Sequence, residues 1–136
     1  MTVFEPLICD TYPRISRSDV KLLWHSGFWD GPLSGMLVFN GERCWFGLVV
    51  ENEDDDYTWY RRFAVLRLTL YEIAEEQHWH DLFRLHVGTH TDYGPDERRT
   101  GGAVLPKEQH HNFYDQYQQR PKQDYSRNPI LGWFET

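Results

Sequence analysis

The chain has 136 residues, enough to bury one hydrophobic core, so the sequence predicts a single domain over residues 1–136. Its formal net charge is −7, from 21 acidic and 14 basic residues, which argues against the broad basic surface that binds nucleic acid or an anionic membrane. Two cysteines, Cys9 and Cys44, are too few for a disulfide framework or a zinc ribbon, so we expect reduced thiols in a cytoplasmic protein.

The first part of the chain predicts an arm followed by one strand. Apolar residues mix with Pro6 and Pro13 over residues 1–18, which excludes a long regular element and leaves room for a short edge strand. The opening residues lack the pattern of a secretory signal, and no apolar run has the roughly 20 residues of a membrane span. The apolar run from Val20 to Trp24 then predicts a strand.

The loop from Phe28 to Gly35 has two interpretations. An Asp-Gly-Pro sequence that starts at Asp30 forces a turn in it. In one interpretation, the aromatic residues of the loop cover an end of the sheet. In the other it is a recognition loop, in which glycines let the backbone approach a ligand and Trp29 offers a flat surface for stacking.

A β-hairpin over residues 36–50 is the clearest structural prediction. Asn40-Gly41 stands between two apolar runs, and both central residues of a type I′ turn need positive φ. A two-residue turn at this point pairs Met36 with Trp45 and leaves apolar residues on both faces of the hairpin. The hairpin is therefore expected inside a sheet or beneath a helix.

A run of carboxylates follows the hairpin, interrupted by a single asparagine: Glu51, Glu53, Asp54, Asp55 and Asp56. It lacks the alternating ligands, the central glycine and the final bidentate glutamate of an EF-hand loop. We expect an exposed turn between strands, whose negative charge also suits a basic partner. A third long strand is predicted from Tyr57 to Leu68, because aromatic and β-branched residues such as Trp59 are dense there.

Thr69 and Glu72 have the spacing of a capping box and predict the start of a helix over residues 70–87, which Gly88 is placed to end. The 3.6-residue period puts one stripe toward the core: Tyr71, Ala74, His78, Leu82 and Leu85. An adjoining stripe contains Trp79, Phe83 and His86. The same period puts a polar set mainly on the solvent side: Glu76, Gln77, His80, Asp81 and Arg84.

The rest of the chain predicts a loop, a second helix and a final strand. Residues 88–105 form a loop longer than usual for a compact domain, so we expect it to be functional or mobile. Pro106 suits the first turn of a helix over residues 106–120. The apolar end from Ile130 to Phe134 is expected to dock as a strand.

These elements predict an α+β fold. An antiparallel sheet of about four or five strands is built around the hairpin, and the 70–87 helix lies across one face. A small half-open barrel is the main variant.

Histidines are dense between His78 and His111, which is the one indication of an active centre. His78 and His80 point about 160° apart on a helix and cannot chelate one ion together. The metal ligands that remain are His86, His90 and Asp92, for a divalent ion such as zinc or manganese.

Three classes of function stay open from the sequence. The leading class is a non-enzymatic protein that binds another protein with a basic surface, as inhibitors, immunity proteins and anti-defence proteins do, and a homodimer is also compatible. No catalytic residue is assigned, because no nucleophile elbow or phosphate loop is present. The expected binding residues combine acidic side chains with tryptophans: Trp29, Asp30, Trp45, Glu53, Asp54, Asp55, Asp56 and Trp59.

The two alternative classes use other residues. A metal-dependent hydrolase would use His86, His90 and Asp92. A small-ligand module for nucleotide-like molecules would use Trp29 and the loop from Asp30 to Gly35.

Overall fold

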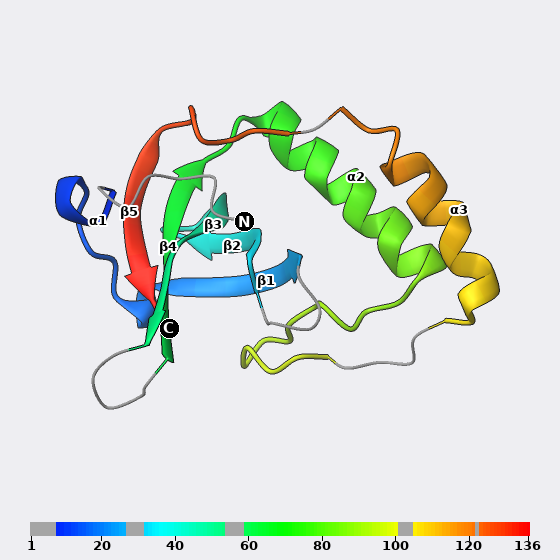
Figure 1. Ribbon diagram of the computed structural model, residues 1–136, viewed down its shortest axis with the longest axis horizontal. Helices are drawn as coiled ribbons and strands as arrows, with labels where there is room; N and C mark the ends of the chain where they lie inside the picture. Colours follow the sequence, from blue (N-terminus) through cyan, green and yellow to red (C-terminus); the bar gives the residue numbers. More distant parts are fainter. Residues whose placement is uncertain (1–7, 27–31, 54–58, 101–104, 122) are drawn as a thin grey trace. The chain divides into compact units, whose positions relative to one another are not determined.

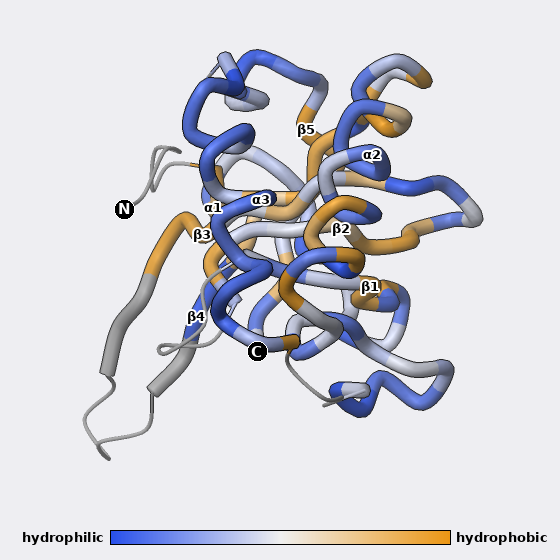
Figure 2. The backbone as a smooth tube through the Cα atoms, turned by 90° about the vertical axis from the view of Figure 1, so that its right-hand side faces the viewer, coloured by the Kyte–Doolittle hydropathy of each residue, from blue (hydrophilic) through white to orange (hydrophobic). Residues whose placement is uncertain are grey.

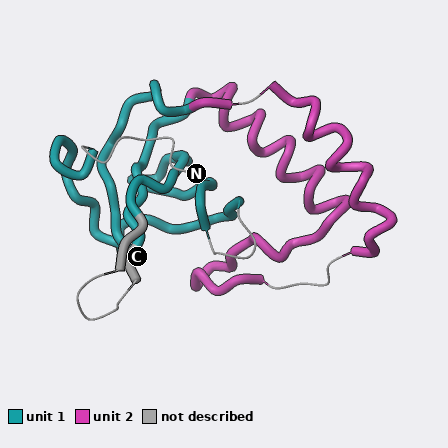
Figure 3. Tube along the Cα trace, viewed as in Figure 1, with its two compact units in different colours: residues 1–68, 125–136 teal, residues 69–124 magenta. Residues whose placement is uncertain are grey.

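The structure is a computed structural model that describes residues 8–26, 32–53, 59–100, 105–121 and 123–136, and it describes residues 51–53, 59 and 60 by their backbone alone. The chain divides into two compact units (Figure 3). The sheet unit contains Met1–Leu68 and Tyr125–Thr136, and the helical unit contains Thr69–Asp124. The expected single domain stays a prediction.

The sheet unit contains a five-stranded antiparallel sheet in the order β1-β2-β3-β4-β5 (Figure 1). Its strands are β1 (Val20–Ser26), β2 (Ser34–Phe39), β3 (Glu42–Glu53), β4 (Trp59–Arg67) and β5 (Ile130–Glu135). Together with the helices, this sheet confirms the predicted α+β fold. The expected final strand is β5, which crosses back to pair with β4.

The predicted hairpin is formed by β2 and β3 in the expected register. Met36 pairs with Trp45, and the turn residues Asn40 and Gly41 have φ of 53° and 77°. Because β1 lies on one side of this hairpin and β4 on the other, both of its strands are interior. This interior position agrees with the expectation from the apolar residues on both faces of the hairpin.

Three phenylalanines from different strands form the centre of the sheet unit. The ring centroids of Phe46 and Phe63 lie 5.4 Å apart, and those of Phe63 and Phe134 lie 5.3 Å apart. All three side chains are buried. A second cluster joins Ile8, from the short helix α1 (Ile8–Thr11), to residues of β3 and β4.

The free side of β5 is covered by the chain just after α1. The amide of Ile15 donates to the carbonyl of Trp133 at 2.6 Å, and the amide of Trp133 donates to the carbonyl of Pro13 at 3.1 Å. A single 3₁₀ turn, Arg17–Asp19, then leads into β1. The expected arm is therefore a strap that satisfies the backbone groups of an edge strand.

The helical unit contains α2 (Leu70–His86) and α3 (Lys107–Tyr117). Thr69 and Glu72 form the predicted capping box: the Glu72 amide donates to the Thr69 hydroxyl at 3.1 Å, and the Thr69 amide donates to the Glu72 carboxylate at 2.9 Å. Aromatic rings fill the space between the helices, with Trp79 and Phe83 both against Phe113. Among the described residues, no helix combines the length and the apolar character that a membrane crossing needs.

The prediction of which α2 face is buried is wrong. Tyr71 and Leu85 of the expected core stripe are 76% and 63% exposed. Glu76 and His80, which were expected on the solvent side, are buried. The reason is that distant parts of the chain supply partners for these two polar groups, and a paired polar group can be buried where an unpaired one cannot.

Candidate functional site

The first carboxylates of the acidic run, Glu51 and Glu53, lie where β3 and β4 continue as a two-stranded ladder. The last pairs before the connecting segment are Asn52 with Tyr60 and Glu53 with Trp59. The ladders of β2 and β5 stop earlier, at the Ser34–Gly47 and Arg62–Glu135 pairs. In the described parts of the chain, no third strand therefore flanks these last two pairs. We call the segment from Asn52 to Tyr60 the hairpin end; it belongs to the antiparallel pair of β3 and β4 and not to the β2–β3 hairpin described above.

A β-bulge sets which residues meet at the hairpin end. The register of β3 against β4 shifts by one residue between Leu48 and Val50. Without this shift, Glu53 would pair with Thr58 instead of Trp59. The bulge therefore pairs a tryptophan, rather than a threonine, with Glu53 at the end of β3.

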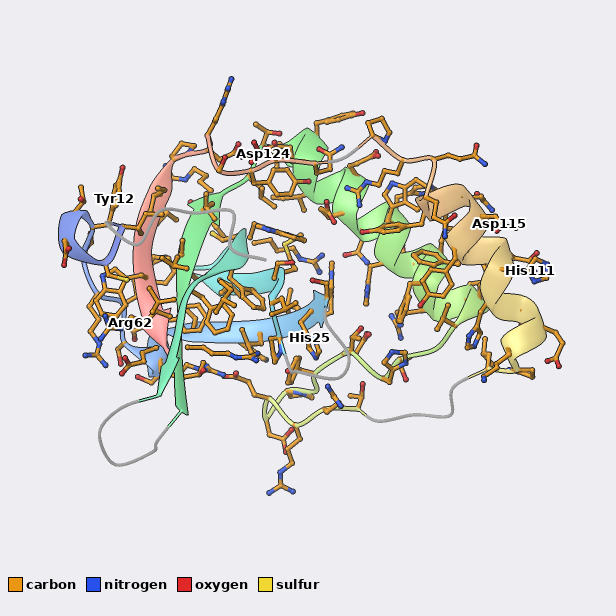
Figure 4. The ribbon with its side chains drawn as sticks, viewed as in Figure 1. Tyr12, His25, Arg62, His111, Asp115 and Asp124 are labelled. Atoms are coloured by element: carbon orange, nitrogen blue, oxygen red, sulfur yellow. The ribbon has the colours of Figure 1, made fainter. Side chains whose placement is uncertain are left out.

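Arg62 and Glu135 brace the base of the hairpin end. The Arg62 guanidinium donates to the Glu135 carboxylate at 3.0 Å (Figure 4). The same guanidinium lies over the Trp133 ring, 5.1 Å from its centroid. Arg61 donates to the carbonyl of Pro32 at 3.1 Å. These contacts anchor the start of β4 to the rest of the sheet unit.

Only some of the expected binding residues are described by the structure. Trp29, Asp30, Asp54, Asp55 and Asp56 lie outside the described residues, so the recognition loop and the centre of the acidic run stay predictions. Glu53 and Trp59 are placed by their backbone pairing. The predicted roles of all these residues in binding are untested.

Trp45 is half-buried, and its ring is used inside the sheet unit. It makes an edge-to-face contact with Tyr125, with ring centroids 5.2 Å apart, and it packs against the cluster around Ile8. Its expected role as a binding anchor stays a prediction. The side chain has a structural role whatever its part in binding.

A histidine–carboxylate contact ties the 88–100 loop to α2. The Nε2 atom of His80 lies 3.1 Å from each carboxylate oxygen of Asp92 and hydrogen-bonds to Oδ2. Arg84 approaches the same carboxylate at 3.5 Å. The Thr100 hydroxyl donates to the backbone carbonyl of Asp92 at 3.2 Å. Both the side chain and the backbone of Asp92 are therefore hydrogen-bonded. The sequence prediction joined Asp92 with His86 and His90 and did not anticipate its contact with His80.

His90 packs against the edge of the Phe83 ring, with centroids 5.2 Å apart. Burial is the main cause that lowers the pKa of His90. The positive charge of Arg99 and the proximity of His110 lower this pKa further, whereas the negative charge of Asp92 opposes them. The imidazole is therefore less readily protonated than in the unfolded chain. His86, the other predicted ligand, is half-exposed at the end of α2.

The metal-centre hypothesis gains no geometric support. In the described residues, no three side chains of the His, Cys, Asp and Glu types are arranged to hold an ion. The combination of His86, His90 and Asp92 with zinc or manganese stays a prediction, as does the hydrolase that would depend on it. Asp92 instead contacts His80 and Arg84.

A buried ion pair between Glu76 and Arg120 was not anticipated from the sequence. The two side chains are 8% and 7% exposed, and the Arg120 guanidinium lies over the rings of Trp79 and Tyr117. This arrangement fixes the segment after α3 against α2. It is a structural pair, because the aromatic rings on either side leave the charges little exposure.

The two cysteines are unpaired and poorly suited to nucleophilic chemistry. Burial raises the pKa of the Cys44 thiol to about 11, with Glu42 acting in the same direction. Burial also raises the pKa of Cys9. Both thiols are therefore protonated at neutral pH, whereas a nucleophilic cysteine needs the thiolate.

In comparisons with models of protein families, with curated proteins and with solved structures, none matches this chain.

Proposed function

We propose that the protein acts by binding another protein through the hairpin end, without catalysing a reaction. The observation that carries this proposal is the backbone register, which pairs Glu53 with Trp59 immediately before Asp54, Asp55 and Asp56. A tryptophan next to a dense run of carboxylates is a combination that suits a basic protein surface. The tryptophan supplies apolar contact area, and the carboxylates supply complementary charge.

The charge of the whole chain supports the same kind of partner. A net charge of −7 repels nucleic acid and other acidic proteins, and it attracts a basic surface over a distance of about 10 Å at ordinary salt concentration. A local cluster of carboxylates strengthens this attraction and speeds association. The class that fits best is an acidic inhibitor, of the immunity or anti-defence type, that covers a basic site on its target.

The experiment begins with the full tagged chain as bait for partners that are then identified and purified. Binding of the purified partner is measured for wild type and for a neutralised hairpin variant that carries Glu53→Gln, Asp54→Asn, Asp55→Asn and Asp56→Asn. A matched control removes four exposed carboxylates elsewhere: Asp10→Asn, Asp19→Asn, Glu108→Gln and Asp115→Asn, the last of which is labelled in Figure 4. A third variant, Trp59→Ala, tests the aromatic anchor.

We expect the neutralised hairpin variant to bind about tenfold more weakly or worse, chiefly through a slower association rate whose salt dependence is reduced. The control, with the same change in net charge, should stay close to wild type. Trp59→Ala should raise the dissociation rate. Equal affinity of the hairpin variant and wild type would refute the proposal, since these carboxylates would then contribute nothing to binding. An equal loss of affinity in the hairpin variant and the control would also refute it, since net charge alone would then explain the attraction.

A further inference from the structure

A mainly apolar stripe, interrupted by His78, runs along the exposed side of α2. Tyr71, Ala74, His78 and Leu85 are exposed, and Leu82 between them is half-buried. Their spacing of three or four residues puts them on one side of the helix. We call these five residues the α2 stripe. Figure 2 shows apolar positions recurring along this helix.

The α2 stripe is not needed to hold α2 within the helical unit. A different side of the helix does this, through Glu76 with Arg120, His80 with Asp92, and Phe83 against Phe113. A surface helix normally turns its apolar side toward the core and its charged side toward water. In α2 only part of the apolar surface does so: Trp79 and Phe83 face α3, whereas Tyr71 and Leu85 are left exposed without a role in the packing of α2 on α3.

Carboxylates border the α2 stripe. Glu72 and Glu75 lie toward one side of it and Asp81 toward the other, as the helical period dictates. Each is already oriented by a neighbour: the Thr69 amide donates to Glu72 at 2.9 Å, the Trp79 indole donates to Glu75 at 3.1 Å, and Gln77 donates to Asp81 at 2.9 Å. The single arginine or lysine of α2 is Arg84, which contacts Asp92 away from the stripe. The border of the stripe therefore has one sign of charge.

We propose that the α2 stripe docks an amphipathic helix of a partner protein, with an apolar face bordered by lysine or arginine. The stripe from Tyr71 to Leu85 extends for roughly 21 Å along the helix, a narrow footprint that one helix of about four turns matches. A second copy of this chain is disfavoured, because its own stripe would bring carboxylates against carboxylates. The inference deepens the proposed function and rests on it, since it gives the same partner-binding protein a second contact surface.

The docking surface is small, so the contact is weak on its own. Two or three exposed apolar side chains bury far less than the roughly 1,200 Å² of a stable interface. Binding should therefore be detectable at micromolar concentrations and strengthen when the hairpin end engages the same partner.

The test uses the full chain and a synthetic helical peptide of about 18 residues as the probe. Its apolar face consists of leucines, and lysines border that face. Two control peptides replace the lysines by glutamates or scramble the sequence so that the leucines no longer share a face. Binding is followed by chemical-shift changes in isotope-labelled protein, at low and at high salt.

Two protein variants locate the contact. Tyr71→Gln with Leu85→Gln removes the two most exposed apolar side chains of the stripe. Leu70→Gln is the matched control, because Leu70 is 86% exposed on the same helix but lies beside the stripe. Since all three side chains are exposed, denaturant midpoints should stay near wild type for both variants.

The expected result is that the lysine-bordered peptide shifts resonances of Tyr71, His78 and Leu85, and that binding weakens about tenfold in the double variant and hardly at all in Leu70→Gln. The glutamate-bordered and scrambled peptides should bind at least about tenfold more weakly. Three results would overturn the inference: equal binding of the glutamate-bordered peptide, shifts confined to other residues, or a concentration-dependent dimer of the chain that the double variant abolishes. A marked loss of stability in the double variant would also overturn it, because the stripe would then serve the fold.

The failure of this inference is distinguishable from the failure of the proposed function. The neutralised hairpin variant keeps the α2 stripe intact, and the double variant keeps the hairpin end intact. If the purified partner loses affinity for the first variant and not for the second, the proposed function stands and the stripe is not its docking surface.

Discussion

Gly35 of β2 lies close against the backbone of β1. It pairs with His25, and a methyl group added to it would meet the Trp24 carbonyl oxygen at 2.1 Å and the His25 Cα at 2.7 Å. Both of these are backbone atoms, so relief would require the two strands to separate. We expect Gly35→Ala to lower the free energy of unfolding by about 3 kcal/mol or more, measured by urea denaturation.

Gly41 provides the control for that substitution. A methyl group added there meets nothing within 4 Å, but the residue has a φ of 77° in the hairpin turn. Gly41→Ala should therefore cost about 1 kcal/mol, from backbone strain alone. If the two variants lost equal stability, the close approach of β1 and β2 would not be the constraint that excludes side chains at Gly35.

His90 makes the stability of the helical unit depend on pH. Its pKa is lowered from 6.5 by burial first, so the folded chain binds this proton less readily than the unfolded chain does. The stabilising contribution is fully present above the unfolded value of 6.5 and is lost as the pH falls through the lowered folded value. Wild type should therefore lose more stability than His90→Gln when the pH falls from about 7.5 to about 5.

Thermal unfolding of both proteins at the two pH values checks this expectation. The comparison isolates His90, because the contact of His80 with Asp92 is present in wild type and in the variant. Parallel losses of stability in the two proteins would mean that protonation of another group dominates the response to acid.

At the scale of elements, structure that depends on neighbouring residues was predicted well, and structure that depends on long-range contacts was not. The Asn40-Gly41 turn and the capping box of Thr69 and Glu72 are each defined by a few neighbouring residues, and both formed as predicted. The buried face of α2 depends on Arg120, which is 44 residues from Glu76. No periodicity within the helix can reveal a counter-charge at that distance, so the apolar stripe was assigned to the core.

The candidate site shows the same division. The acidic run and its neighbouring tryptophans are visible in the sequence. The turn that the sequence predicts between the two strands lies outside the described residues. The pairing of Glu53 with Trp59 depends on the bulge between Leu48 and Val50, for which the sequence carries no clear signal. The composition of the hairpin end was therefore predictable, whereas its register was not.

Glu76 and Arg120 connect α2 to the segment after α3 at a buried position. Removing one member should leave the other as an uncompensated buried charge, so we expect Arg120→Met to cost about 3–5 kcal/mol. Replacing both, as in Glu76→Leu with Arg120→Met, should restore most of that loss. Denaturation of the two single variants and the double variant measures the coupling, and a double variant as unstable as the sum of the singles would contradict it.

At the scale of the whole molecule, the two units have separate cores. The sheet unit is built around Phe46, Phe63 and Phe134, and the helical unit around Phe113 and the aromatic rings of α2. The chain passes between the units after Leu68 and again after Asp124. Separate cores allow one unit to open while the other keeps its hydrogen bonds, because local opening follows the contacts within a cooperative unit.

Hydrogen exchange of two variants tests whether the units open independently. In Arg120→Met the amides of α2 and α3 should lose protection, while those of β3 and β4 keep the protection of wild type, because the substitution removes the contacts with Glu76, Trp79 and Tyr117 in the helical unit. In Gly35→Ala the pattern should reverse, since the strain lies between β1 and β2. A uniform loss of protection across the chain in both variants would show one cooperative domain, in agreement with the prediction from chain length and against independent opening.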